Sequence, residues 1–189
     1  GLGKTLQVLT YLAWAIEQGR ISPTGGDPDS PPWRPILIIA PLMLVEDGTW
    51  EKEIQQFFRN SGSTFDPIGV VHGAALDEFR AESLRGRETQ LGSPTLDPVK
   101  LMRYRLLITN YETVKNYQHS FAQTIDGRSI WSIVVTDEAQ EFRTPNTKVS
   151  HAIKALEPDL HVACTGTPVE NRLLDIWNIF DALQPALLG

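Results

Sequence analysis

The sequence has little cysteine and no long apolar run. A single cysteine, Cys164, occurs in 189 residues, which excludes a disulfide framework and is typical of proteins from reducing compartments. The longest apolar stretch, residues 36–45, has about half of the ~20 residues that a membrane-spanning helix needs, and it contains Pro41. We therefore expect a cytoplasmic protein, nucleoid-associated if bacterial, with no membrane partner.

Basic charge is also scarce. The chain has 17 Lys and Arg against 23 Asp and Glu, which gives a net charge of −6. Proteins that bind nucleic acid without sequence preference tend to be basic, because the release of counterions drives much of their affinity. Composition therefore argues against nucleic-acid binding, and any such prediction has to rest on particular motifs. With 41% hydrophobic and 21% charged residues, the chain otherwise has the composition of an ordinary globular domain.

Short apolar runs alternate with amphipathic stretches along the chain. Strands are predicted at residues 36–40, 68–72, 106–109, 133–136 and 160–164, and helices at 6–16, 50–58, 76–84, 112–123, 149–156 and 174–183. Strands that are apolar throughout are covered on both faces, which indicates a parallel sheet. The predicted fold class is therefore α/β, a three-layer α/β/α domain with a mostly parallel central sheet.

Three details of this pattern remain to be tested by the structure. The proline-rich residues 22–35 are predicted to be an irregular insertion, and the weakly periodic residues 85–100 an exposed one. The apolar face of the last helix is predicted to consist of Leu174, Trp177, Phe180 and Leu183.

The chain opens with Gly1-Leu2-Gly3-Lys4-Thr5, the back half of a phosphate-binding loop of the form G-x-x-x-x-G-K-[ST]. In such a loop, backbone amides and the positive end of the following helix hold phosphates. Lys4 is predicted to reach the β- and γ-phosphates of ATP, and the Thr5 hydroxyl to ligate Mg²⁺. The alternative is a glycine turn that caps a helix. We expect that the chain is cut within this loop.

A second motif, Asp137-Glu138-Ala139-Gln140, directly follows the predicted strand 133–136. Carboxylates placed there lie at the carboxyl edge of a parallel sheet, where α/β proteins bind their ligands. Asp137 is predicted to hold Mg²⁺, and Glu138 to orient or deprotonate the attacking water. An isolated acid pair is more often the acidic start of a helix. After a phosphate-loop signature, the catalytic interpretation is favoured.

A third motif, Thr165-Gly166-Thr167, ends the predicted strand 160–164. Threonine hydroxyls at this edge would sense the γ-phosphate through hydrogen bonds. A plain turn between a strand and a helix explains the same residues equally well.

Five motifs occur in order: G-L-G-K-T (1–5), I-I-A-P-L-M-L-V (38–45), L-L-I-T-N-Y-E-T-V (106–114), V-V-T-D-E-A-Q (134–140) and T-G-T-P-V-E-N-R-L-L-D-I-W (165–177). Together they resemble the first motor domain of Swi/Snf-type ATPases in helicase superfamily two, in a bacterial branch. The resemblance implies a RecA-like P-loop NTPase fold. It also implies an ATP-driven, Mg²⁺-dependent motor that tracks along double-stranded DNA, usually without separating the strands.

The resemblance also assigns roles to individual residues. Lys4 and Glu138 would be catalytic, Gly1, Leu2, Gly3, Lys4 and Thr5 would bind ATP, and Thr5 and Asp137 would hold the metal. Gln140, Thr165, Gly166 and Thr167 would couple nucleotide state to DNA, and Ala40, Pro41, Thr109 and Asn110 would contact phosphates of one strand. Such contacts, made largely through backbone amides and helix ends, do not read sequence and need few lysines.

The chain departs from the family pattern at several positions. Asn110 stands where serine is more common, and Gln140 replaces the commoner histidine. His72 before Gly73 is predicted to be structural.

Residues 1–189 would then be the first of two RecA-like domains. The second, in the rest of the same chain, would supply an arginine-bearing motif, so we expect this fragment alone to be inactive. The alternative function is that of a nucleotide-dependent switch or a scaffold domain without DNA translocation.

Overall fold

The structure, a computed structural model, describes residues 3–19, 21, 33–58, 64–81, 88, 92–166 and 173–184. The predicted site residues Gly1, Leu2 and Thr167 lie outside the described residues, as does most of the predicted insertion 22–35. Within the described part of the chain, no helix has the length and apolar character needed to cross a membrane.

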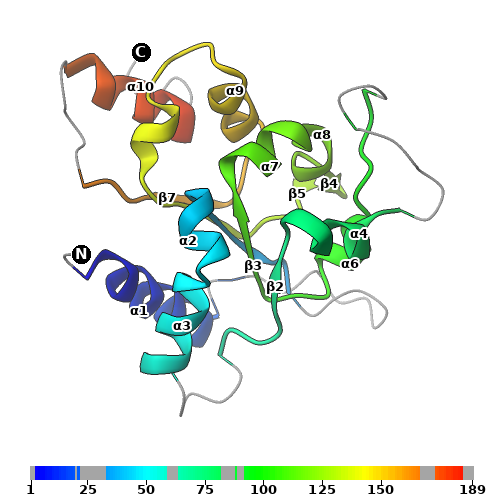
Figure 1. The fold of residues 1–189 in the computed structure, drawn as a ribbon, viewed down its shortest axis with the longest axis vertical. Helices are drawn as coiled ribbons and strands as arrows, with labels where there is room; N and C mark the ends of the chain where they lie inside the picture. Colours follow the sequence, from blue (N-terminus) through cyan, green and yellow to red (C-terminus); the bar gives the residue numbers. More distant parts are fainter. Residues whose placement is uncertain are drawn as a thin grey trace.

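A five-stranded sheet with the order β2-β3-β1-β6-β7 forms the centre of the molecule (Figure 1). Its strands are β1 (Ile36–Ala40), β2 (Ile68–Val70), β3 (Leu106–Asn110), β6 (Ile133–Thr136) and β7 (Leu160–Ala163). Every neighbouring pair is parallel. In the register of the sheet, Ile38 of β1 lies opposite Ile108 of β3 and Val135 of β6. The predicted parallel sheet is confirmed.

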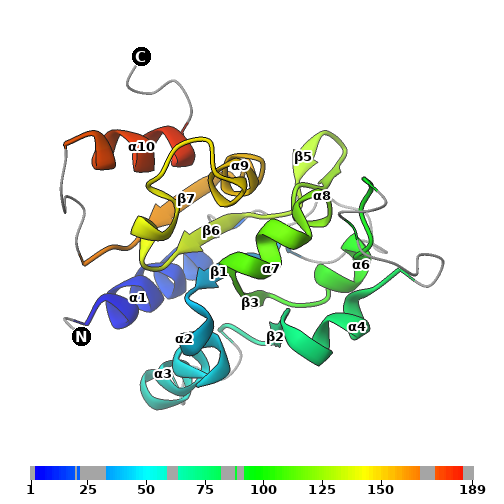
Figure 2. The same cartoon turned by 45° about the horizontal axis from the view of Figure 1, so that its top comes forward.

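Helices cover both faces of this sheet (Figure 2). One face carries α1 (Lys4–Glu17), α2 (Leu42–Glu46) and α3 (Thr49–Phe57), and the other carries α7 (Tyr111–Asn116), α9 (Lys148–Lys154) and α10 (Leu173–Leu183). Because side chains alternate along a strand, Ile36 and Ile38 pack with α1 and α3, whereas Leu37 and Ile39 belong to the core beneath α7 and α9. The three-layer α/β/α architecture is therefore confirmed.

The remaining elements are short. They are the helices α4 (Leu76–Phe79), α6 (Pro98–Leu101) and α8 (Gln118–Phe121), the 3₁₀ turns η1 (Gly73–Ala75) and η2 (Ala139–Phe142), and the antiparallel pair β4 (Thr124–Ile125) and β5 (Arg128–Ser129).

Two predicted helices are shorter in the structure. The helix predicted at 112–123 is divided into α7 and α8 at Tyr117, whose φ of −118° is not helical. The helix predicted at 76–84 ends at Phe79, because Arg80 turns into an extended conformation and forms a β-bridge with Leu96. In both places a tertiary contact or a local break overrides the periodic pattern.

The prediction that residues 85–100 are exposed was wrong for the described part of that segment. Thr95 and Leu96 are buried, and Glu88 is 1% exposed. The Glu88 carboxylate accepts hydrogen bonds from the Thr95 N–H (3.2 Å) and the Ser120 N–H (2.8 Å), and also from the Ser120 hydroxyl. Donors from the protein thus satisfy the buried carboxylate in place of water. Because Ser120 belongs to α8, these hydrogen bonds hold the segment against that helix.

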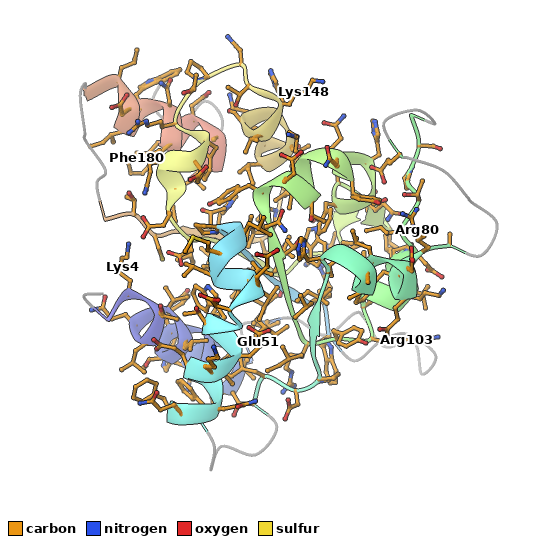
Figure 3. The ribbon with its side chains drawn as sticks, viewed as in Figure 1. Lys4, Glu51, Arg80, Arg103, Lys148 and Phe180 are labelled. Carbon is orange, nitrogen blue, oxygen red and sulfur yellow. The ribbon has the colours of Figure 1, made fainter. Side chains whose placement is uncertain are left out.

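The buried face of α10 also differs from the prediction. Ile179 and Ala182 are buried in the core, and of the predicted residues Leu183 packs against it. Leu174 is 54% exposed, Trp177 36% and Phe180 44% (Figure 3). Apolar residues occur on several sides of this helix, so their spacing alone does not specify one face. The rotation is fixed by packing against α9 and by the ion pair between Lys154 and Asp181.

Arg34 holds together the end of the sheet at which β1 begins. Its buried guanidinium donates from Nε to the Ser129 carbonyl (2.9 Å) and from Nη2 to the Trp131 carbonyl (2.6 Å), and Nη1 lies 2.5 Å from Asp159 Oδ2. The planar guanidinium fork suits such a set of acceptors. The end of the predicted insertion 22–35 is therefore part of the folded core.

Candidate nucleotide-binding site

The parallel sheet brings the predicted site residues to one edge. The carboxyl ends of parallel strands point the same way, so the residues that follow β1, β3, β6 and β7 lie at a common edge. Pro41 follows β1, Tyr111 follows β3, Asp137 follows β6, and Thr165 comes shortly after β7. The described part of the predicted phosphate loop, Gly3 and the start of α1, adds a lysine to this edge.

Gly3 allows α1 to begin at Lys4. It precedes the helix with a φ of 73°, in the left-handed region that glycine adopts without steric cost. Lys4 projects from the first turn of α1 (Figure 3), and its Nζ lies 2.8 Å from Glu138 Oε1. This hydrogen bond to a carboxylate raises the pKa of Lys4.

Main-chain hydrogen bonds to β1 and to the residue after β7 hold the Asp137–Glu138 turn. The Asp137 N–H donates to the Ile39 carbonyl of β1 (2.8 Å), and the Ala139 N–H donates to the Cys164 carbonyl after β7 (2.8 Å). Glu138 has a φ of 53°, which is uncommon for a residue with a side chain and costs about 1–3 kcal/mol. The surrounding sheet holds this strained conformation in place.

The two carboxyl groups of this turn differ in their electrostatics. Burial, and then the charge of Glu138, raise the pKa of Asp137, which is only 6% exposed. Hydrogen bonds from Lys4 and Gln140 lower the pKa of Glu138. Asp137 is therefore a buried carboxylate whose negative charge a bound cation would stabilise, and Glu138 is ionised and already paired.

This arrangement fits Mg²⁺ that arrives with a nucleotide. Among the described residues there is no cluster of three or more His, Cys, Asp or Glu side chains that would hold a metal alone. Proteins commonly bind Mg²⁺ through one or two carboxylates together with the phosphates of the substrate. Asp137 meets that requirement, and Thr5, in the first turn of α1, offers a hydroxyl next to Lys4 in the chain.

The predicted coupling residues continue from Glu138 toward the end of β7. Gln140 Nε2 donates to Glu138 Oε2 (2.7 Å), and the Thr165 hydroxyl donates to Gln140 Oε1 (2.7 Å). Gly166 borders the same site, since a Cβ added there would lie 3.4 Å from Lys4 Nζ. Four side chains, from Lys4 through Glu138 and Gln140 to Thr165, thus form one continuous polar chain.

The four predicted DNA-contact residues lie at the ends of β1 and β3. Ala40 is buried, and Pro41 immediately precedes α2. The Thr109 hydroxyl donates to the Val71 carbonyl (2.8 Å). Asn110 accepts the Thr113 N–H through Oδ1 (2.8 Å). The polar side chains at this edge therefore bind within the protein, and a phosphate would meet mainly backbone groups here.

His72 has a structural contact at the same edge. Because Asn110 Oδ1 is occupied by the Thr113 N–H, Asn110 Nδ2 faces His72 and donates to its Nδ1 (2.7 Å). This bond requires that Nδ1 carry no proton.

Sequence reasoning missed Tyr111. Its buried hydroxyl donates to the main-chain carbonyl of Asp137 (2.7 Å), and its ring packs against Phe142 with 6.1 Å between centroids. Burial raises the pKa of Tyr111 well above its usual value, so the hydroxyl remains a donor. The available signal was its position, directly after a strand that ends at the site edge.

The fold is RecA-like. The structure resembles a Sulfolobus solfataricus SWI2/SNF2 ATPase core in complex with dsDNA, with a TM-score of 0.68 and 26% identity over 100% of this chain and 31% of that one. The Pyrococcus furiosus Hef helicase domain shares the fold, with a TM-score of 0.58 and 15% identity over 97% of this chain and 31% of that one.

The chain belongs to the SNF2-related domain family, which it matches over residues 1–189. It is 36% identical to the Zorya protein ZorD of Escherichia coli and 30% identical to the putative ATP-dependent helicase/translocase YwqA of Bacillus subtilis. It is 26% identical to the human DNA excision repair protein ERCC-6-like. Each match covers 100% of this chain but only 16%, 16% and 13% of the relative.

Proposed function

We propose that this chain is the ATP-binding and ATP-hydrolysing half of a motor that translocates on double-stranded DNA or remodels protein–DNA complexes. The observation that carries the proposal is the 2.8 Å contact between Lys4 and Glu138, beside the buried carboxylate of Asp137. A cation at the start of a helix and an acid pair at the end of a central strand are the groups that hydrolysis of a nucleoside triphosphate requires.

The roles of the side chains follow from their contacts. The Lys4 ammonium would leave Glu138 for the β- and γ-phosphates of ATP, and Glu138, no longer paired, would orient the attacking water and accept its proton. Asp137 and Thr5 would hold Mg²⁺, which neutralises charge on the phosphate oxygens when bound. Gln140 is hydrogen-bonded to both Glu138 and Thr165. A movement of Glu138 on nucleotide binding would therefore be transmitted through Gln140 to Thr165.

Double-stranded DNA is the proposed partner. It is supported by the resemblance to an ATPase core in complex with dsDNA and by the placement of Ala40, Pro41, Thr109 and Asn110 at the same edge as the acid pair. Contacts to phosphates through backbone groups would not distinguish base sequences. They would also be compatible with a net charge of −6.

The test is ATP turnover by the full-length protein with and without duplex DNA. We expect duplexes of unrelated sequence to stimulate turnover equally, and we expect added salt to weaken their binding. Lys4→Ala should weaken nucleotide binding, whereas Lys148→Ala, which removes an exposed lysine far from the site (Figure 3), should not. Turnover that is indifferent to DNA would support a nucleotide-dependent switch instead.

A second RecA-like domain in the same polypeptide is the other proposed partner. In this superfamily an arginine from that domain completes the site, and loss of such an arginine typically lowers the rate by about 10³–10⁵-fold. Residues 1–189 alone should therefore be nearly inert as an ATPase. DNA-stimulated turnover by the isolated fragment that disappears in Lys4→Ala would contradict the two-domain mechanism.

A further inference from the structure

Tyr111 connects two parts of the candidate site that are remote in sequence. It is the first residue of α7 and directly follows Asn110, at the edge proposed to contact DNA. Its hydroxyl donates to the main-chain carbonyl of Asp137 at 2.7 Å. The hydrogen bond is buried, so water does not compete for this carbonyl.

The carbonyl that Tyr111 holds belongs to the peptide between Asp137 and Glu138. Rotation of that peptide sets φ of Glu138, which is 53° and therefore strained. That backbone conformation directs the Glu138 carboxylate toward Lys4 and Gln140. A change in the peptide plane would redirect the carboxylate.

Other hydrogen bonds hold the Glu138 N–H of this peptide and the backbone on either side of it. The Asp137 N–H and the Ala139 N–H donate to Ile39 and Cys164, and the Glu138 N–H donates to Asp137 Oδ1 (3.0 Å). None of these engages the Asp137 carbonyl. Among the described residues, the Tyr111 hydroxyl is therefore the donor that holds the Asp137 carbonyl.

We propose that Tyr111 is a positioning residue for ATP hydrolysis, which holds the peptide that aims Glu138 and links it to the strand end at Asn110. This inference rests on the proposed function, in which Glu138 activates the attacking water. A shift of the β3 end would move Tyr111, and with it the Asp137 carbonyl. The contact thus offers a direct path from the proposed DNA edge to the hydrolytic acid.

The experiment compares Tyr111→Phe with the parent in the full-length protein. Phenylalanine keeps the ring that packs against Phe142 and removes only the donor. We expect kcat to fall about 2–10-fold, the effect of one lost hydrogen bond of typical strength, with and without duplex DNA. Nucleotide Kd and DNA Kd should stay within about twofold of the parent, because Lys4 and the strand ends are unchanged.

Two further variants separate positioning from packing. Tyr104→Phe removes a hydroxyl that donates to Glu78 at 2.8 Å, away from the site, and should leave kcat unchanged. Phe142→Leu disturbs the ring packing of Tyr111 but keeps its hydroxyl, so it should retain most of the parent kcat. If Phe142→Leu slows turnover as much as Tyr111→Phe does, packing explains the effect and the positioning role is wrong.

The remaining outcomes distinguish this inference from the proposed function. A Tyr111→Phe variant with parent kcat overturns the inference and leaves the proposed function intact. A parent protein that duplex DNA does not stimulate, but that Tyr111→Phe slows, contradicts the DNA partner and supports the positioning role. Parent-level turnover in Glu138→Gln removes the assigned base and the inference with it.

Discussion

Lys4 and Glu138 are 134 residues apart in the sequence, yet Nζ of one lies 2.8 Å from Oε1 of the other. Both side chains are partly accessible, with 29% and 31% of their surfaces exposed. Ion pairs with this degree of exposure contribute little net free energy. A nucleotide phosphate would therefore displace Glu138 from Lys4 at a small cost in free energy.

Glu138→Gln should bind nucleotide at least as tightly as the parent and should hydrolyse it at least about 10²-fold more slowly, because it loses a general base. Affinity is preserved because Lys4 no longer faces a carboxylate that competes with phosphate. Fluorescent-nucleotide titration and steady-state turnover measure the two effects. Glu141→Gln, an exposed acid three positions away, serves as the control, and parent-level turnover in Glu138→Gln would show that another residue is the base.

Thr165→Val should weaken the coupling of DNA to hydrolysis. The substitution keeps the shape of the side chain and removes the hydroxyl that donates to Gln140 Oε1. We expect the ratio of duplex-stimulated to basal turnover to fall about 2–10-fold, the range for one hydrogen bond, with nucleotide affinity unchanged. Thr10→Val, which removes a hydroxyl bonded to the Leu6 carbonyl on α1, should leave the ratio as it is; an equal loss there would indicate a non-specific effect.

His161 should make the stability of the domain sensitive to mild acid. Burial lowers its pKa to about 4, and its Nε2 has no hydrogen-bond partner among the described residues. In the unfolded chain histidine has a pKa of ~6.5, so the unfolded state takes up the proton first. The contribution to stability is therefore complete above about pH 6.5 and is lost as the pH falls from there toward 4.

The measurement is the opening free energy from hydrogen exchange of β6 and β7 at pH 7.5 and pH 5. His161→Leu should remove about 2 kcal/mol of the difference between the two conditions. His151→Leu, at an exposed position on α9, provides the matched control. The prediction fails if His161→Leu and the parent lose the same stability on acidification.

Arg34→Lys should destabilise the edge where β1 begins by about 2–4 kcal/mol. Lysine has one point charge in place of the guanidinium fork, so buried carbonyls of Ser129 and Trp131 would lose donors. Hydrogen exchange of the amides at residues 129–133 would report the loss. Arg103→Lys, at an exposed position (Figure 3), should change stability by less than about 0.5 kcal/mol, and comparable effects of both substitutions would refute the anchoring role.

The sheet was predictable because its signal is local. Each strand is a continuous apolar run, and the alternation with helices requires parallel neighbours. The convergence of Lys4 and Glu138 also followed from the sequence, since the ends of parallel strands meet at one edge. Neither inference depends on the orientation of a side chain.

The features that the sequence did not predict depend on the rotation of a helix about its axis and on contacts between residues far apart in the chain. The α10 helix is apolar on several sides, so its buried face is selected by α9 and not by its own pattern. The burial of Glu88 depends on donors at Thr95 and Ser120, which no local pattern connects. The role of Tyr111 depends on one hydroxyl that reaches a neighbouring turn.

The strand order places β3, β1 and β6 side by side. Neighbouring strands are about 4.8 Å apart, so roughly 10 Å separates the end of the strand that carries Asn110 from the end of the strand that precedes Asp137. Over this distance the sheet behaves as a stiff body, because packed interiors are poorly compressible. A displacement of less than about one ångström at the end of β3 would therefore be passed on to the end of β6.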